Sequence, residues 1–335
     1  MLDQLTKLAA DSLRRDYPDI EQIQILDLEE TGGYASAPQW SVRLTWLAGR
    51  VRHRNTYVAR SAPGQADPAR LAELGRRLSQ AGVPAPALIG ASTDPSKSLL
   101  LFEAAPGQPA AQALRRARMR WQISALAVTL ARALASLHRL DWSSVAPWLA
   151  DPDALPEDAI DEQVDDLMDG LTTRAERLPT TWREAVSRAL AWLDLRRPVT
   201  VSLCLCHGEF GPDTVILDQD EVSGLYGWER AILTDAAFDL ALLPYQTRRL
   251  GLPSDDADLF LQTLLASYLQ LSPRSLENLP FYVVARLTAR ALDVVEAAFT
   301  SSPSSTLDAA ILVEEHLTTL CRAIELAERA PWQAG

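Results

Sequence analysis

The first third of the chain alternates hydrophobic and polar residues with the period of β-strands. The alternation is clearest at residues 23–28 and 40–46, and a third such segment at 54–60 follows after a turn. Two further extended segments are expected at 83–90 and 98–103. Short alternating strands joined by turns are typical of antiparallel sheets. The pattern therefore predicts an antiparallel sheet in the first third of the protein.

Helical spacing of apolar residues predicts the remaining elements. A short helix is expected over residues 1–20, and another at 67–80, where Asp67 is the N-cap and Pro68 takes the first helical position. Further helices are expected at 119–140, 181–195, 255–271, 280–299 and 307–329. A β-rich region at 1–104 followed by a mainly helical region at 105–335 predicts an α+β protein with two lobes.

Charge and composition exclude several classes of protein. The formal net charge of −12 argues against nucleic acid as a partner, because phosphate binding needs a concentrated basic surface. No apolar run is long enough for a transmembrane helix, and the first residues lack the layout of a secretory signal. Three cysteines without framework spacing fit a reducing compartment. We expect a soluble, cytoplasmic protein without a membrane partner.

Acidic residues are concentrated between positions 151 and 169. Nine Asp or Glu residues lie there, with no Lys or Arg among them. The run fits a solvated helix face or a linker, and it also fits a surface that faces a cationic substrate. The sequence leaves both interpretations open.

Two short polar segments beside predicted strands carry most of the candidate chemistry. The first follows an apolar strand expected at 201–206, and the second follows residues 224–226. Their notable members are His207, Glu209, Asp213, Thr214, Gly227, Trp228 and Glu229. From residue type alone, His207 fits a buried core histidine, and Glu209 fits a loop carboxylate that accepts backbone N–H groups. Cys204 and Cys206 alternate along the strand, and we expect them to face the core, because no second Cys/His group stands nearby for zinc.

The spacing of these segments resembles the aminoglycoside phosphotransferase and choline kinase family, a branch of the protein-kinase-like fold. That family carries His-x-Asp in the first loop, with Asn five residues after the Asp, and Asp-Trp-Glu in the second loop. Here the same spacing contains His207, Glu209 and Thr214, and then Gly227 before Trp228. The resemblance implies a β-rich N-lobe, a helical C-lobe and a nucleotide cleft between them. It gives His207 a role in shaping the loop.

The resemblance also implies roles for the residues that depart from the family pattern. Glu209 takes the position of the base that accepts the substrate hydroxyl proton. Thr214 and Gly227 take the positions of two Mg²⁺ ligands, although Thr214 offers a neutral oxygen and Gly227 offers no side chain. Asp213 and Glu229 are candidate replacement ligands. For Glu229 the alternative is a structural ion pair.

The nucleotide-binding residues implied by the resemblance lie in the first lobe. Gly32 and Gly33 match the family's glycine-containing loop, and a hairpin turn explains them equally well. Arg60 matches the basic residue that faces the phosphates, with a solvated strand-end arginine as the alternative. Its helix partner in the family is a glutamate, and Glu73 is the nearest candidate.

Two functions follow from this combination of scaffold and altered residues. The first is a family protein with lost or strongly weakened phosphotransferase activity, which binds a small molecule or nucleotide and takes a protein partner. The second is an active ATP-dependent kinase for a hydroxyl of a small, cationic molecule, with Glu209 as base. ATP and Mg²⁺ are the expected cofactors if the protein is active, and none is required if it is not.

Overall fold

The computed structural model describes residues 2–34, 37–61, 67–92, 99–150, 158–300 and 306–329. Contacts along the chain group it into two compact units, each described here by itself. Unit 1 contains residues 1–133, 211–230 and 250–264, and unit 2 contains 134–210, 231–249 and 265–335. Helices α4 (Arg120–His138) and α10 (Ser254–Leu271) contribute residues to both. Among the described residues, no helix has the length and apolar character needed to cross a membrane.

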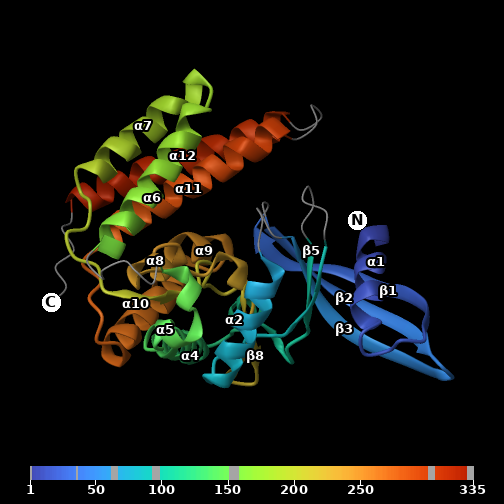
Figure 1. Ribbon diagram of the computed structural model, residues 1–335. Coiled ribbons are helices and arrows are strands. Elements are labelled where there is room, and N and C mark those ends of the chain that lie inside the picture. The colour runs from blue at the N-terminus through green and yellow to red at the C-terminus, as the bar shows by residue number, and fades with distance from the viewer. Residues whose placement is uncertain are drawn as a thin grey trace. The chain divides into compact units, whose positions relative to one another are not determined.

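Unit 1 is built on a five-stranded antiparallel sheet with the order β1-β2-β3-β5-β4 (Figure 1). Its strands are β1 (Ile20–Tyr34), β2 (Ala37–Ala48), β3 (Val51–Ser61), β4 (Leu88–Ala91) and β5 (Leu99–Glu103). Helix α1 (Leu2–Leu13) packs on the sheet, and buried residues of α1, β2, β3 and β5 form one hydrophobic core. The antiparallel sheet predicted from period-two alternation is confirmed.

Helix α2 (Pro68–Gln80) begins where the sequence predicts. The Asp67 side chain accepts hydrogen bonds from the N–H groups of Ala69 and Arg70, and Pro68 occupies the first position. Unit 1 also contains α3 (Ala110–Arg116) and a small antiparallel sheet with the order β6-β8-β9. These strands are β6 (Gln108–Pro109), β8 (Val215–Asp218) and β9 (Glu221–Leu225).

Unit 2 is mainly helical. Helices α6 (Asp158–Glu176), α7 (Thr180–Asp194), α11 (Leu279–Thr300) and α12 (Thr306–Arg329) pack side by side (Figure 1). Strand β7 (Leu203–Cys206), which directly precedes the loop with His207 and Glu209, pairs antiparallel with β10 (Ile232–Asp235). The remaining elements are α5 (Trp142–Val145), η1 (Pro147–Leu149), α8 (Ala237–Leu240) and α9 (Leu243–Arg249), and η2 (Trp228–Arg230) belongs to unit 1.

Two expected boundaries differ from the structure. The first helix ends at Leu13, short of the 1–20 range, and β1 starts at Ile20 after a turn in which the Ile20 N–H donates to Tyr17 O.

The acidic run at 151–169 lies partly outside the described residues, and its described part falls on α6. There Asp165, Asp166 and Asp169 are exposed, as a solvated helix face requires.

Candidate functional site

The loop after β7 in unit 2 is fixed by one buried carboxylate, that of Asp239. Its two oxygens accept hydrogen bonds from the N–H groups of His207 and Gly208, each at 2.7 Å. The Glu209 N–H donates to His207 Nδ1 at 3.1 Å. Gly208 has φ +83°, a backbone conformation that side-chain-bearing residues rarely adopt. The backbone that presents Glu209 is therefore fixed at three successive residues.

Asp239 is tied to a second buried group, the imidazole of His138. His138 Nε2 lies 3.1 Å from Asp239 Oδ2, and His138 Nδ1 lies 2.8 Å from the Tyr268 hydroxyl. Burial by itself raises the pKa of Asp239, but the hydrogen bond and charge of His138, with those of His207, outweigh it and lower that pKa. Asp239 is therefore held as a carboxylate that braces the loop.

The low pKa of Asp239 leads to an expected dependence of stability on pH. A carboxyl group whose pKa is lower in the folded than in the unfolded state stabilises the fold above the unfolded value, here 3.8, and loses that contribution as pH falls through the folded-state pKa. We expect stability to fall steeply below about pH 4. Urea unfolding midpoints measured against pH should fall less steeply over this range in Asp239→Asn, and equal slopes would contradict the assignment.

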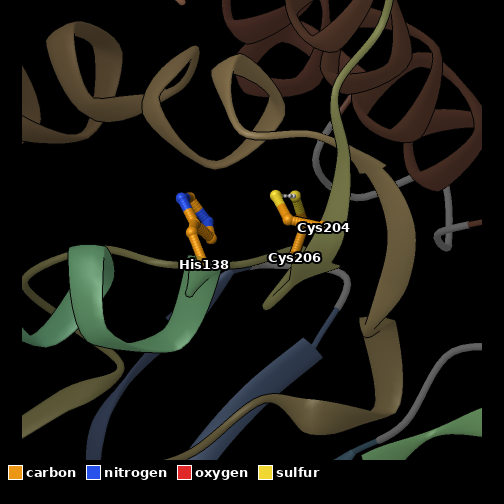
Figure 2. Close-up of side chains that lie close together, drawn as sticks. All are labelled: His138, Cys204 and Cys206. Atoms are coloured by element: carbon orange, nitrogen blue, oxygen red, sulfur yellow. Dashed lines mark hydrogen bonds between the residues drawn. The ribbon is translucent and has the colours of Figure 1, made fainter. Parts of the chain in front are cut away.

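Cys204, Cys206 and His138 form a cluster that the sequence did not foresee (Figure 2). All three side chains are fully buried, and the two sulfur atoms lie 3.7 Å apart. Both cysteines face the core of unit 2, as their alternation predicts. Both nitrogens of His138 already have partners in Tyr268 and Asp239, so a metal ion on this ring would have to displace one of them. The cluster is best explained as a hydrogen-bonded core.

Glu209 is buried beside a guanidinium that sequence reasoning missed. Its side chain has no exposed surface, and its Oε1 lies 3.6 Å from Nη2 of Arg290 on α11. Arg286, one turn earlier on α11, donates from Nη2 to the Gly208 carbonyl. No sequence signal marks this pairing, because α11 lies far along the chain from the loop.

Thr214 and Gly227 lie in unit 1 at the ends of β8 and β9. The Thr214 hydroxyl donates to the Gly211 carbonyl at 3.1 Å, and its own carbonyl accepts from Tyr226 N–H. Gly227 has φ +107°, which disfavours any side chain at this position. Asp213 is partly buried in the same loop. The Thr214 oxygen is thus engaged within its own turn.

Arg60 and Glu229 form a buried ion pair in unit 1. Nε and Nη2 of Arg60 lie 2.9 and 2.8 Å from Glu229 Oε1, and Nη1 donates to Gln39 Oε1 at 2.7 Å. The two charged side chains are 0% and 1% exposed. The interpretation of Arg60 as a solvated arginine at a strand end is therefore wrong. The structural ion pair considered for Glu229 is present, with Arg60 as its partner.

Glu73 and the two glycines have other local surroundings. Glu73 on α2 accepts hydrogen bonds from Arg76 and Arg77, and these bonds, led by that of Arg76, lower its pKa to about 2. The structure thus places Glu229, and not the expected Glu73, against Arg60. Gly32 and Gly33 pair with Gln39 and Pro38 at the end of the β1–β2 hairpin. This position fits both a turn and a backbone that approaches a phosphate.

Three of the four candidate magnesium residues, Thr214, Gly227 and Glu229, are poorly suited to such an ion, and Asp213 remains a candidate ligand. Mg²⁺ needs oxygen ligands, usually one or two carboxylates. Gly227 has no side chain, the Thr214 hydroxyl is engaged, and Oε1 of Glu229 is bonded to Arg60. Oε2 of Glu229 is buried without a hydrogen-bond partner, but its charge is already balanced by the guanidinium.

Comparisons with known proteins agree with this architecture. The model of the phosphotransferase enzyme family (APH) matches residues 37–293. The aminoglycoside 3'-phosphotransferase of Streptomyces fradiae is 29% identical over 240 residues, which cover 69% of this chain and 82% of that protein.

Solved structures of this family share the fold. A thermostable mutant of aminoglycoside phosphotransferase APH(4)-Ia matches with a TM-score of 0.60 at 15% identity, covering 93% of this chain and 98% of the other. The type VIII aminoglycoside-3'-phosphotransferase matches with a TM-score of 0.51 at 26% identity, covering 83% and 97%. These similarities confirm the kinase-like fold, with its N-terminal antiparallel sheet and mainly helical remainder. The family match spans more than half of the sequence, and the chain therefore belongs to the phosphotransferase enzyme family.

Proposed function

We propose that the protein is an ATP-using phosphotransferase that phosphorylates a hydroxyl of a small molecule. The observation that carries the proposal is the loop of unit 2, where Asp239 and His207 fix the backbone that presents the Glu209 carboxylate. Family membership supports the reaction type, and none of the comparisons indicates that activity is lost. Among the structural relatives, a mutant of APH(4)-Ia forms a ternary complex with ADP and hygromycin B, and the amicoumacin kinase is in complex with AMP-PNP, Ca²⁺ and Ami.

In the proposed reaction Glu209 acts as the general base, which requires its carboxylate, buried in this structure, to become accessible to the substrate hydroxyl. The substrate hydroxyl gives its proton to the carboxylate, its oxygen forms a bond to the γ-phosphorus of ATP, and the bond from that phosphorus to the leaving ADP oxygen breaks. Gly32 and Gly33 are the proposed nucleotide contacts in unit 1, since the absence of Cβ lets backbone N–H groups approach phosphate oxygens. Arg60 on β3 is buried against Glu229, and its proposed role is to hold the loop at residues 227–229 against β3.

The substrate is proposed to carry amine cations. The exposed carboxylates Asp165, Asp166 and Asp169 of α6 supply negative charge, and aminoglycosides, on which a relative acts by name, are amine-bearing molecules. A neutral analogue of the same size should then bind more weakly at low ionic strength.

A second candidate is a family protein that binds a nucleotide or small molecule without phosphoryl transfer, with a protein as its partner. Gly227 and the engaged groups of Thr214 and Glu229 favour it, because charge neutralisation by a metal ion is central to phosphoryl transfer. Binding of ATP without turnover would support this candidate over the first.

Substitution of Glu209 tests the proposed base. We expect Glu209→Gln to lower kcat by about 10²-fold or more, because general base catalysis contributes that much and the amide accepts no proton. Nucleotide affinity should change little. Glu221→Gln, which alters an exposed carboxylate on β9, is the matched control. Unchanged kcat in Glu209→Gln would remove Glu209 from the mechanism.

A further inference from the structure

One face of α11 presents charged side chains to the loop after β7, which contains Gly208 and Glu209. Arg286, Arg290 and Asp293 are spaced by four and three residues, so their side chains share that face. Arg286 reaches the Gly208 carbonyl and Arg290 reaches Glu209. Both contacts fall on the tripeptide that presents the proposed base.

The contact between Arg290 and Glu209 lies away from water. The Glu209 side chain is 0% exposed and that of Arg290 is 8% exposed, and Arg290 Nη2 lies 3.6 Å from Glu209 Oε1. A buried carboxylate without an opposite charge is strongly disfavoured, so the neighbouring guanidinium favours the ionised form of Glu209 in this place. Glutamate is also one methylene longer than aspartate, and an additional restraint is needed to keep its carboxylate in one position.

Arg290 is itself held in place. Its Nη1 donates to Asp293 Oδ2 at 3.2 Å, and the other oxygen of Asp293 accepts from Arg174 on α6 at 2.8 Å. Arg174 also bonds Glu296 at 2.8 Å. Alternating charges therefore link α6 and α11 to the loop, and they fix the guanidinium before any substrate binds.

Arg286 and Asp239 restrain the backbone next to the same carboxylate. The Arg286 guanidinium carbon lies 4.0 Å from the centroid of the Phe238 ring while Nη2 donates to Gly208 O. Asp239 accepts the N–H of that same glycine. The peptide groups before Glu209 are held by these two residues, and Arg290 contacts the side chain of Glu209 itself.

We propose that Arg290 is a positioning residue that holds the Glu209 carboxylate ionised and in place for proton abstraction. The inference rests on the proposed function for its catalytic part, and on the buried pair alone for its structural part. Arg290 contacts the proposed base, and in this proposal it acts through Glu209.

A double-mutant cycle tests the pair without any activity measurement. We expect Arg290→Met to lower the melting temperature by about 5 °C or more, because it takes the guanidinium away from a buried carboxylate. The double variant Arg290→Met/Glu209→Gln should melt within about 2 °C of Glu209→Gln alone. Arg188→Met, at an exposed arginine of α7, is the control and should change little. Additive shifts in the cycle would overturn the inference whether or not the protein is active.

Kinetics separate positioning from a merely structural pair. Arg290→Met should lower kcat by about 10²-fold with KM within about threefold, since displacement of a reacting group by 1 Å costs this much, and Arg290→Lys should recover part of the loss. Coupling in the cycle with unchanged kcat in Arg290→Met would overturn the positioning role. Absence of turnover in the wild-type protein would overturn the proposed function, and the positioning role with it, while the cycle still decides whether Arg290 compensates Glu209.

Discussion

Replacement of Asp239 by alanine is expected to lower the free energy of unfolding by about 3–5 kcal/mol. The variant leaves the N–H groups of His207 and Gly208 without their acceptor, and it takes the carboxylate away from His138. Each buried polar group without a partner costs about 1–3 kcal/mol, and these groups are in the core of unit 2. Urea unfolding followed by circular dichroism measures the difference.

The same variant should lose activity beyond its loss of stability. Without the carboxylate, the loop no longer presents Glu209 in one backbone conformation. Activity measured at urea concentrations well below the unfolding transition should therefore also fall. Asp258→Ala, at an exposed carboxylate of α10, is the control for stability. A destabilisation below about 1 kcal/mol in Asp239→Ala would show that Asp239 does not hold the loop.

Replacement of Arg60 by methionine in unit 1 is expected to lower the free energy of unfolding by about 3–5 kcal/mol. Methionine fills much of the volume, but it leaves Glu229 as a buried charge without its guanidinium and leaves Gln39 Oε1 without its donor. The larger part of the cost comes from the unpaired carboxylate. Chemical denaturation at neutral pH measures it.

The double variant Arg60→Met/Glu229→Gln distinguishes the two sources of this cost. Because it removes both charges, we expect it to regain more than half of the stability lost in Arg60→Met. Arg43→Met on β2, where the arginine pairs with Asp27 at an exposed site, should be nearly neutral. If the double variant is as unstable as Arg60→Met, the buried pair is not what binds the second loop to β3.

Much of the fold is predictable from local sequence patterns. Helices expected at 255–271 and 280–299 occur as α10 and α11 within one residue at each end. Strand β1 is longer than the alternating segment at 23–28, because its polar stretch pairs with β2 through backbone hydrogen bonds, which do not depend on side-chain polarity. The helix expected over 1–20 ends early for a related reason, since the turn at Tyr17 starts the strand.

The contacts of the candidate site residues were less predictable than the fold. Family spacing pointed to Glu209, Thr214, Gly227 and Glu229 as candidates, but not to the partners of these residues. Arg60 and Glu229 are 169 residues apart, so their pairing leaves no local signal. Glu73 illustrates the opposite case, because arginines three and four residues later on α2 satisfy it within its own helix. Contacts created by tertiary folding require the structure.

Substrate-dependent release of ADP is the most direct test of phosphotransferase function. Purified protein is incubated with ATP and a panel of hydroxylated small molecules, with and without amine groups, in the presence and absence of Mg²⁺. We predict that at least one amine-bearing compound stimulates ADP release in the wild-type protein, and that Glu209→Gln reduces this release by about 10²-fold or more. ATP binding without stimulated release by any compound, or equal release by the two proteins, would contradict the proposed function.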